Sequence, residues 1–166
     1  MELEFKPVVA GDIDRLRPFY GLRPNKTCDS VFLDSFLWKD YYHVQCAVSE
    51  GRAVLWLMEK DGQVSTAMPL CREEDLPYFF QQMVDYFSGV LHKPFYISLA
   101  DEEAVQCLNL DPALFEVEEQ VDLKDYLYSG EELRKLEGKK FVKKRNHLNG
   151  FKRTYEGRYE YRRLCC

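Results

Sequence analysis

The 166-residue sequence lacks a long apolar run, and no secretory signal is expected in its first residues. No segment approaches about 18 consecutive apolar residues, the length at which a transmembrane helix is expected. The first residues, MELEFKPVVAGD, contain neither the basic region nor the apolar region of a secretory signal. With 46% hydrophobic and 14% aromatic residues, the chain is predicted to form one packed globular domain, and the cytoplasm is its expected location.

Metal sites and hydrolytic triads also lack their sequence patterns. The chain has three histidines in neither H-x-x-H nor H-E-x-x-H spacing, and no Ser or Cys stands in a nucleophile elbow. No metal is predicted, and the catalytic residues are unknown. The internal cysteines are expected to be small buried hydrophobes because none belongs to a C-x-x-C pair: Cys28, Cys46, Cys71 and Cys107. Cys165 and Cys166 are expected to form a reactive tail.

Glycine is absent from the junction where a strand-to-helix phosphate loop could lie. Residues 68–75 read MPLCREED. A phosphate-cradling loop needs glycines so that backbone N–H groups can approach the anion. Three acidic side chains in this junction would also repel phosphate, so no such loop is expected here.

Apolar periodicity and turn residues predict an α/β (α+β) fold with a mixed, largely antiparallel sheet flanked by helices. Glu50-Gly51 and Asp61-Gly62 have the composition of two-residue hairpin turns. The expected strands span residues 2–8, 43–49, 52–59, 63–70, 95–99, 115–120 and 123–128. The expected helices span residues 12–19, 30–42 (opened by Asp29 or Ser30), 73–91 and 101–108, followed by a basic C-terminal helical segment.

Charge is divided unevenly along the chain. Residues 1–130 contain 11 basic and 23 acidic residues, a net of −12, whereas residues 131–166 contain 12 basic and 5 acidic residues, a net of +7. Such a division creates a directed field that either holds the chain's own parts together or attracts a polyanion.

The basic segment has a defined helical layout. Ser129 and Glu132 match a capping box, and Gly138 is expected to end the first helix in a left-handed cap. At about 100° per residue, a second helix over 139–155 has a narrow apolar arc consisting of Phe141, Leu148, Phe151 and Tyr155. Lys144 projects into this arc and is expected to snorkel or find a partner. The opposite side contains Lys139, Lys140, Lys143, Asn146, His147 and Arg153.

Two interpretations of this helix stay open. It is either a solvated face whose apolar arc packs against the acidic domain, or a face that contacts phosphates. For nucleic acid, His147 is the one evident stacking side chain in the segment. A tethered RNA or a phosphorylated substrate therefore fits better than a free duplex.

Several stretches resemble one bacterial family. DYLY (125–128) followed by LRKLEGKKFVKKRNHLNGFKRTY (133–155) resembles the phosphatidylglycerol lysyltransferase C-terminal domain family, as do RPFYGLRPNKTCDSVF (17–32) and FLDSFLWKDYY (32–42). The order of expected elements also resembles the GNAT acyltransferase fold.

The resemblance implies a tandem architecture of two GNAT-like halves joined by basic helices. Better-known relatives transfer an aminoacyl group from aminoacyl-tRNA to a lipid head group, and Fem-type peptidoglycan ligases share the doubled architecture. By resemblance, residues 1–128 form the first half, 129–157 the connector, and 158–166 the first strand of a missing or truncated second half. The residues implied to bind a substrate or polyanion are Lys140, Lys143, Lys144, Arg145, Asn146 and His147.

The function expected first is that of a GNAT-like half of an aminoacyl- or acyltransferase, inactive alone, with aminoacyl-tRNA or another anionic substrate as partner. A second half or another copy of the chain is the expected protein partner. No cofactor is expected, acetyl-CoA included, because the glycine-free junction departs from the ordinary GNAT pattern. The alternative is a non-catalytic binding or scaffold module, and a small-molecule acetyltransferase ranks last.

Overall fold

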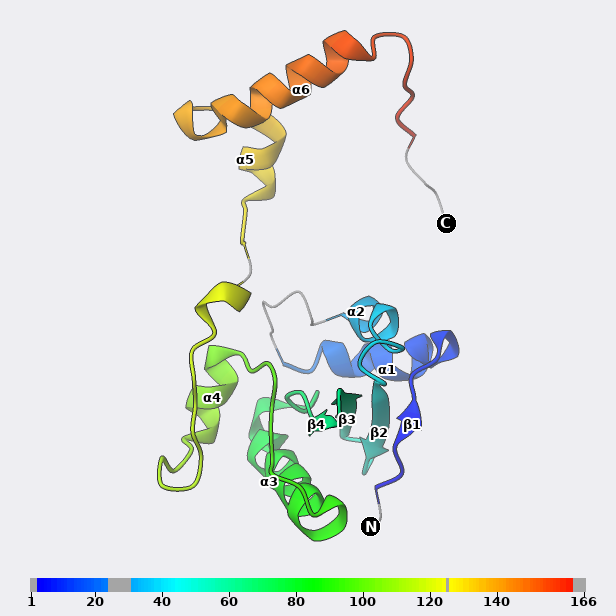
Figure 1. Ribbon diagram of the computed structural model, residues 1–166, viewed down its shortest axis with the longest axis vertical. Helices are drawn as coiled ribbons and strands as arrows, with labels where there is room; N and C mark the ends of the chain where they lie inside the picture. The colour runs from blue at the N-terminus through cyan, green and yellow to red at the C-terminus, as the bar shows by residue number, and fades with distance from the viewer. Residues whose placement is uncertain (1–2, 24–30, 125, 163–166) are drawn as a thin grey trace. The chain divides into compact units, whose positions relative to one another are not determined.

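The computed structural model describes residues 3–23, 31–124 and 126–162 (Figure 1). The chain folds into two compact units, Met1–Asp122 and Leu123–Cys166, and each is described by itself. Among the described helices, none combines the length and the apolar character needed to cross a bilayer. The predicted boundaries at 128 and 157, and the predicted second half, stay predictions.

The first unit is built on a four-stranded antiparallel sheet in the order β1-β2-β3-β4. Its strands are β1 (Lys6–Pro7), β2 (Gln45–Ser49), β3 (Ala53–Lys60) and β4 (Gln63–Ser65). The predicted hairpin turns are confirmed, since Glu50-Gly51 and Asp61-Gly62 have positive φ at all four residues. Such turns match the twist of the strands that they join.

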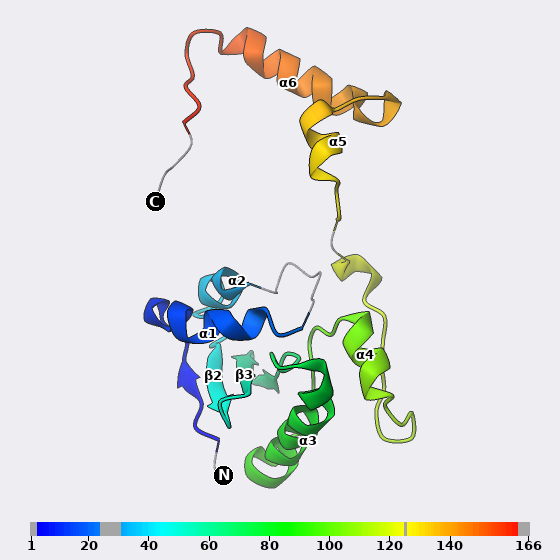
Figure 2. The same cartoon turned by 180° about the vertical axis from the view of Figure 1, so that it is seen from behind.

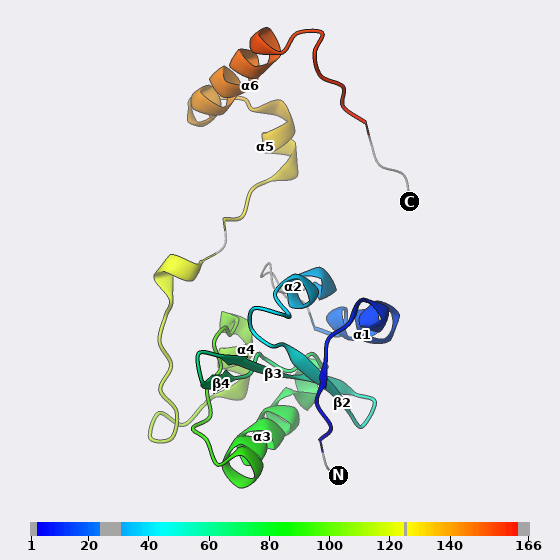
Figure 3. The ribbon, with the colours of Figure 1, turned by 45° about the vertical axis from the view of Figure 1, so that its right-hand side comes forward.

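Helices cover both faces of this sheet (Figure 3). In chain order they are α1 (Ile13–Tyr20), α2 (Phe32–Leu37), α3 (Leu76–Tyr86) and α4 (Glu102–Leu108). Shorter turns lie at Ala10–Asp12, Glu73–Asp75, Phe87–Leu91 and Val121–Leu123. Helices α1 and α2 lie on one side and α3 on the other, which confirms the predicted mixed α+β class.

Strand β3 is buried on both faces, which explains its nearly continuous apolar sequence, AVLWLM. Ala53 and Leu55 belong to the core on the α3 side. Val54 and Trp56 belong to a second core with Leu16 of α1. Because strand side chains alternate between faces, one strand supplies both cores.

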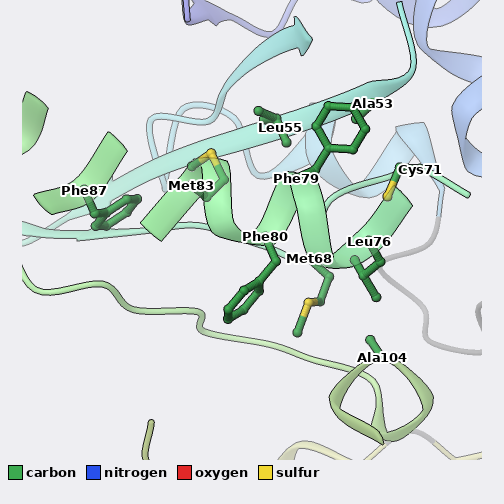
Figure 4. Packing of buried hydrophobic residues seen from close by; sticks show 10 residues of the cluster. All are labelled: Ala53, Leu55, Met68, Cys71, Leu76, Phe79, Phe80, Met83, Phe87 and Ala104. Atoms are coloured by element: carbon green, nitrogen blue, oxygen red, sulfur yellow. The ribbon is translucent and has the colours of Figure 1, made fainter. Parts of the chain in front are cut away.

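The core on the α3 side confirms the helix predicted over 73–91 (Figure 4). Leu76, Phe79, Phe80, Met83 and Phe87 are all buried, at positions i, i+3, i+4, i+7 and i+11. This spacing places them on one helical face. Each such side chain contributes about 1.5–3 kcal/mol when fully buried.

Three predicted strands are wrong over their described residues. Residues 95–99 make only an isolated parallel bridge, Thr66↔Ile97, and residues 115–120 are not in a strand. The described residues of 123–128 are likewise outside strands. The apolar pattern has another cause, because the rings of Phe95 and Phe115 pack 5.3 and 5.5 Å from that of Phe80. Side chains can cover a core in this way without a hydrogen-bonded ladder.

The N-terminal elements are shorter than predicted. The edge strand is limited to Lys6–Pro7, and α2 ends at Leu37, after which the chain runs through turns. The predicted cap at Asp29 or Ser30 lies outside the described residues.

The prediction that the internal cysteines are buried is confirmed for two of them. Cys46 and Cys71 are buried. Burial raises the pKa of Cys71 to about 11, so the thiolate is scarce at neutral pH. Cys107 is partly buried, while Cys28 and the terminal pair lie outside the described residues.

A buried ion pair fixes α4 to the chain that follows α1. Arg23 donates two hydrogen bonds to Asp101, at 2.8 and 3.0 Å, and the two side chains are only 6% and 7% exposed. Asp101 also caps α4 by accepting from the N–H of Ala104 at 2.8 Å. Burial alone would raise the pKa of Asp101, but the bonds from Arg23 and Ala104 outweigh it and the pKa is lowered.

We predict that Asp101→Asn destabilises the first unit by about 3 kcal/mol, because it leaves the buried Arg23 charge unpaired while retaining a capping oxygen. Urea unfolding measures this at neutral pH. A carboxylate whose pKa is lowered by folding stabilises the fold at any pH above its pKa in the unfolded chain, about 3.9. This stabilisation is lost as the pH falls through the lowered pKa of the folded state. The difference between variant and parent should therefore narrow in acid.

Asp40→Asn is the matched control, because Asp40 forms an ion pair with Lys39 but is 89% exposed. A change within about 0.5 kcal/mol is expected there. Equal effects of the two substitutions would mean that the Arg23–Asp101 pair has no special role.

The second unit is helical. Its elements are α5 (Gly130–Lys135), a 3-10 turn at Lys139–Phe141, and α6 (Val142–Thr154). The second helix of the basic segment, predicted over 139–155, is thus confirmed. Residues 158–162 are outside strands, and the strand predicted from residue 158 as the start of a second half stays a prediction.

Candidate functional site

The turn between α5 and α6 sets the geometry of the basic segment (Figure 2). Ser129 caps α5 by accepting from the N–H of Glu132 at 3.4 Å. The Glu132 carboxylate in turn accepts from Lys140 at 2.7 Å. One predicted phosphate-binding residue is therefore engaged by an acid of its own unit.

The end of α5 differs from its prediction. Leu136, with φ of 51°, takes the left-handed C-cap position expected for Gly138, and its N–H donates to the Glu132 carbonyl at 2.7 Å. Gly138 has φ of 81° and instead precedes the 3-10 turn. The helix ends two residues earlier than predicted, which leaves the carbonyls of 136 and 138 available to a donor from α6.

Arg145 is that donor. Its guanidinium donates to the carbonyl of Leu136 and, at 2.9 Å, to that of Gly138. Hydrogen bonds from a charged group contribute about 1.5–3 kcal/mol each. Arg145 is partly buried and holds the end of α5 against the first turns of α6.

Lys144 has found a partner, as its position in the apolar arc predicted. Its Nζ lies 5.4 Å from the centroid of the Tyr128 ring. A cation over an aromatic face gains about 0.5–1 kcal/mol when exposed. Like Lys140 and Arg145, this residue helps to hold its own unit together.

The other three predicted binding residues are exposed on α6: Lys143, Asn146 and His147. Within the described part of the chain, no hydrogen bond or ion pair engages these side chains. The structure thus divides the predicted set into an engaged half and an available half.

Two further cations lie beside the available residues. At about 100° per residue, Arg153 falls within the same arc of α6 as Lys143, and Lys139 lies in the 3-10 turn that leads into this helix. We call this surface the basic face; it consists of Lys139, Lys143, Asn146, His147 and Arg153. Helical spacing alone identified Lys139 and Arg153, but the resemblance drew attention to the contiguous motif instead.

Gly150 lies near the centre of the basic face. A Cβ added there would meet no atom within 4 Å outside its own helix backbone. Glycine costs a helix about 1 kcal/mol relative to Ala, and no neighbour requires its small size. A ligand that approaches the helix backbone closely is one use for such an opening.

The charge division follows the two units. Met1–Asp122 contains 10 basic and 22 acidic residues, and Leu123–Cys166 contains 13 basic and 6 acidic ones. The basic face therefore belongs to a unit of net +7 in a chain of net −5. Its field attracts anions locally and weakens with salt.

The junction at 68–75 is occupied by internal contacts. The N–H of Leu70 donates to Val54 at 3.0 Å, and Glu73 and Glu74 are exposed. The expectation that acetyl-CoA does not bind here stays a prediction. Among the described residues, no group of three or more His, Cys, Asp or Glu could hold a metal ion.

Comparison with known families decides the membership of the chain. The family model for phosphatidylglycerol lysyltransferase, C-terminal, matches residues 21–165. The chain belongs to this lysyltransferase C-terminal family. The match includes the whole basic face and both residues of the Arg23–Asp101 pair. A search of proteins with curated functions gave no match.

A solved structure shares the fold of this family member. It is a conserved protein of unknown function from Bacteroides thetaiotaomicron VPI-5482, with a TM-score of 0.77 and 24% identity. The match covers 93% of this chain and 51% of the other. The chain thus spans about half the length of that structure.

We predict that Arg145→Met loosens the start of α6, because the carbonyls of Leu136 and Gly138 lose their charged donor while the aliphatic stem is retained. Lys143→Met is the matched control, since Lys143 has no such contact. A loss of about 2 kcal/mol would speed amide hydrogen exchange over 139–150 roughly thirtyfold. Equal exchange in the two variants would show that Arg145 does not hold the turn.

Proposed function

We propose that this chain is a GNAT-like half of an aminoacyl- or acyltransferase and that its basic face positions an anionic donor, with aminoacyl-tRNA as the leading candidate. The observation that carries the proposal is the set of unpaired cations on the basic face. Family membership supports the transferase class.

The contrast between paired and unpaired cations in the same segment favours this proposal over a surface that is merely solvated. Lys140, Lys144 and Arg145 each have an intramolecular partner. Lys143 and Arg153 have none, although six acidic residues belong to the same unit. When Lys and Arg side chains contact the phosphates of a nucleic acid, the counterions of those phosphates are released, and this release increases the affinity of the protein for the nucleic acid.

The proposed role of the basic face is positioning rather than bond making. In aminoacyl transfer, a nucleophile on the acceptor attacks the ester carbon, the bond to the tRNA oxygen breaks, and that oxygen takes up a proton. Such a step is accelerated by holding the reactants together and stabilising the developing oxyanion. The basic face would hold the anionic part of the donor, and the residues that act on the ester are unassigned.

A second GNAT-like half, or another copy of the chain, is proposed to complete the site. The chain alone is accordingly expected to bind donor without transferring its aminoacyl group. Acetyl-CoA is not proposed as a cofactor.

The alternative, a non-catalytic binding or scaffold module, is favoured by one observation. Leu148, Phe151 and Tyr155 of the apolar arc are 42–46% exposed. Exposed apolar side chains in a cluster are typical of interaction surfaces. In this alternative, α6 docks a protein partner and its cations are peripheral.

We predict that aminoacyl-tRNA binds the chain and that Lys139→Glu combined with Lys143→Glu lowers its affinity at least tenfold. Lys143 lies in the first turn of α6 and Lys139 in the 3-10 turn before it, and carboxylates near a helix N-terminus suit its dipole, so folding should be retained. Filter binding at about 50 and about 200 mM salt should show a salt slope smaller by about two in the variant.

Arg17→Glu combined with Lys93→Glu provides the matched control. It makes the same change in net charge at two exposed positions of the first unit. Unchanged binding is expected. No binding of the parent chain at low salt, or equal losses in both double variants, would overturn the proposed role of the basic face. Self-association of a chain that does not bind tRNA would favour the scaffold alternative.

We further predict that Gly150→Ala separates stability from binding. Alanine should stabilise α6 by about 1 kcal/mol through helix propensity, while its methyl group intrudes on the basic face and weakens tRNA binding. Circular dichroism against temperature and filter binding measure the two effects. Gly130→Ala in α5, also without a neighbour within 4 Å, should leave binding unchanged. Undiminished binding by Gly150→Ala would mean that the ligand does not approach the helix there.

A further inference from the structure

An open hollow of ≈ 600 Å³ lies at the C-terminal end of α6. Its lining combines cationic, amide and aromatic side chains with one acid: Asn149, Lys152, Arg153, Glu156, Gly157 and Tyr159. Arg153 also belongs to the basic face. The hollow is thus continuous with the proposed binding surface, although the predicted motif ends before it.

Tyr159 is held in a defined position beside this hollow. Gly157 has φ of 67°, and the N–H of Arg158 donates to the carbonyl of Tyr155 at 2.8 Å. This turn brings the ring centroid of Tyr159 to 5.0 Å from that of Phe151. The Tyr159 side chain is nevertheless 48% exposed. The Phe151 ring thus packs against the Tyr159 ring, which is still accessible to solvent.

The charges around the hollow favour one phosphate. Lys152 and Arg153 have no ion pair in the described part of the chain. Glu156 opposes an anion, so the net charge of the lining is only +1. A single phosphate beside an uncharged ring system fits this environment better than a cluster of phosphates.

We infer that this hollow is a nucleotide-stacking subsite, in which the base of an unpaired ribonucleotide packs on Tyr159 while its phosphate contacts Lys152 and Arg153. The inference rests on the proposed function, because it extends the basic face that would bind the rest of the RNA. The base must be unpaired, since bases inside a helix have both faces covered. Stacking on an aromatic ring is the usual means of holding such bases.

The experiment compares two probes of similar charge on the full chain: an unstructured single-stranded RNA oligonucleotide of about eight residues, and inorganic polyphosphate, which has no bases. The subsite predicts that Tyr159→Ala lowers affinity for the oligonucleotide about tenfold and leaves polyphosphate binding unchanged. Tyr159→Phe should retain binding, because it keeps the ring.

Tyr161→Ala is the matched control. Tyr161 is 90% exposed and has no ring neighbour among the described residues, so its removal should change neither affinity. Circular dichroism establishes that each variant keeps its helices. Oligonucleotide binding that is equally strong in the Tyr159→Ala variant, or equally weakened by Tyr161→Ala, would overturn the subsite.

The double variant Lys139→Glu plus Lys143→Glu tells this inference apart from the proposed function. Neither residue lines the hollow. If this variant loses both probes while Tyr159→Ala loses neither, the basic face stands and the subsite fails. If only Tyr159→Ala loses the oligonucleotide, the subsite stands and the proposed role of the basic face fails.

Discussion

Strand β3 imposes the constraint on which the first unit depends. Its alternate side chains enter two separate cores, one under α1 and one over α3. Neither core can loosen without disturbing the strand that supplies the other. The buried Arg23–Asp101 pair adds a long-range tie across the same unit. Removing one partner of such a pair exposes the unit to the full cost of an unpaired buried charge.

The second unit is held together differently. Among the described residues of this unit, Phe141 is the one hydrophobic residue that is buried. Polar contacts therefore stabilise the unit in place of a large core. The guanidinium of Arg145 joins two carbonyls of the α5–α6 turn, while Lys140 and Lys144 add an ion pair and a ring contact. Half of the predicted binding motif is thereby committed to architecture. The other half, together with Lys139 and Arg153, forms the basic face.

Local signals predicted much of the fold, while long-range contacts limited the rest. The turns at Glu50-Gly51 and Asp61-Gly62 and the helix over 73–91 were predictable because adjacent residues determine them. The segments around Phe95 and Phe115 were misread as strands because a ring packed on Phe80 and a residue in a ladder have similar sequence patterns.

The candidate site was predictable to the same extent. Charge and spacing located the basic helix, but they could not show that Arg145 bonds to carbonyls or that Lys140 meets Glu132. Tyr159 was missed as a stacking ring because its segment was read as a strand. The positive φ of Gly157 brings it back towards Phe151, and a glycine two residues before an aromatic side chain was the one hint in the sequence.

The partners of Arg145 are main-chain oxygens, and this bears on how the segment can vary between related proteins. Every residue at 136 offers the same carbonyl, so the hydrogen bond from Arg145 does not depend on the side chain at that position. The demands fall on the guanidinium and on the backbone, since Leu136 and Gly138 have φ of 51° and 81°, and such values favour glycine. A related protein can therefore carry a different side chain at 136, with a different surface at this turn, and still keep the contact between Arg145 and the main chain.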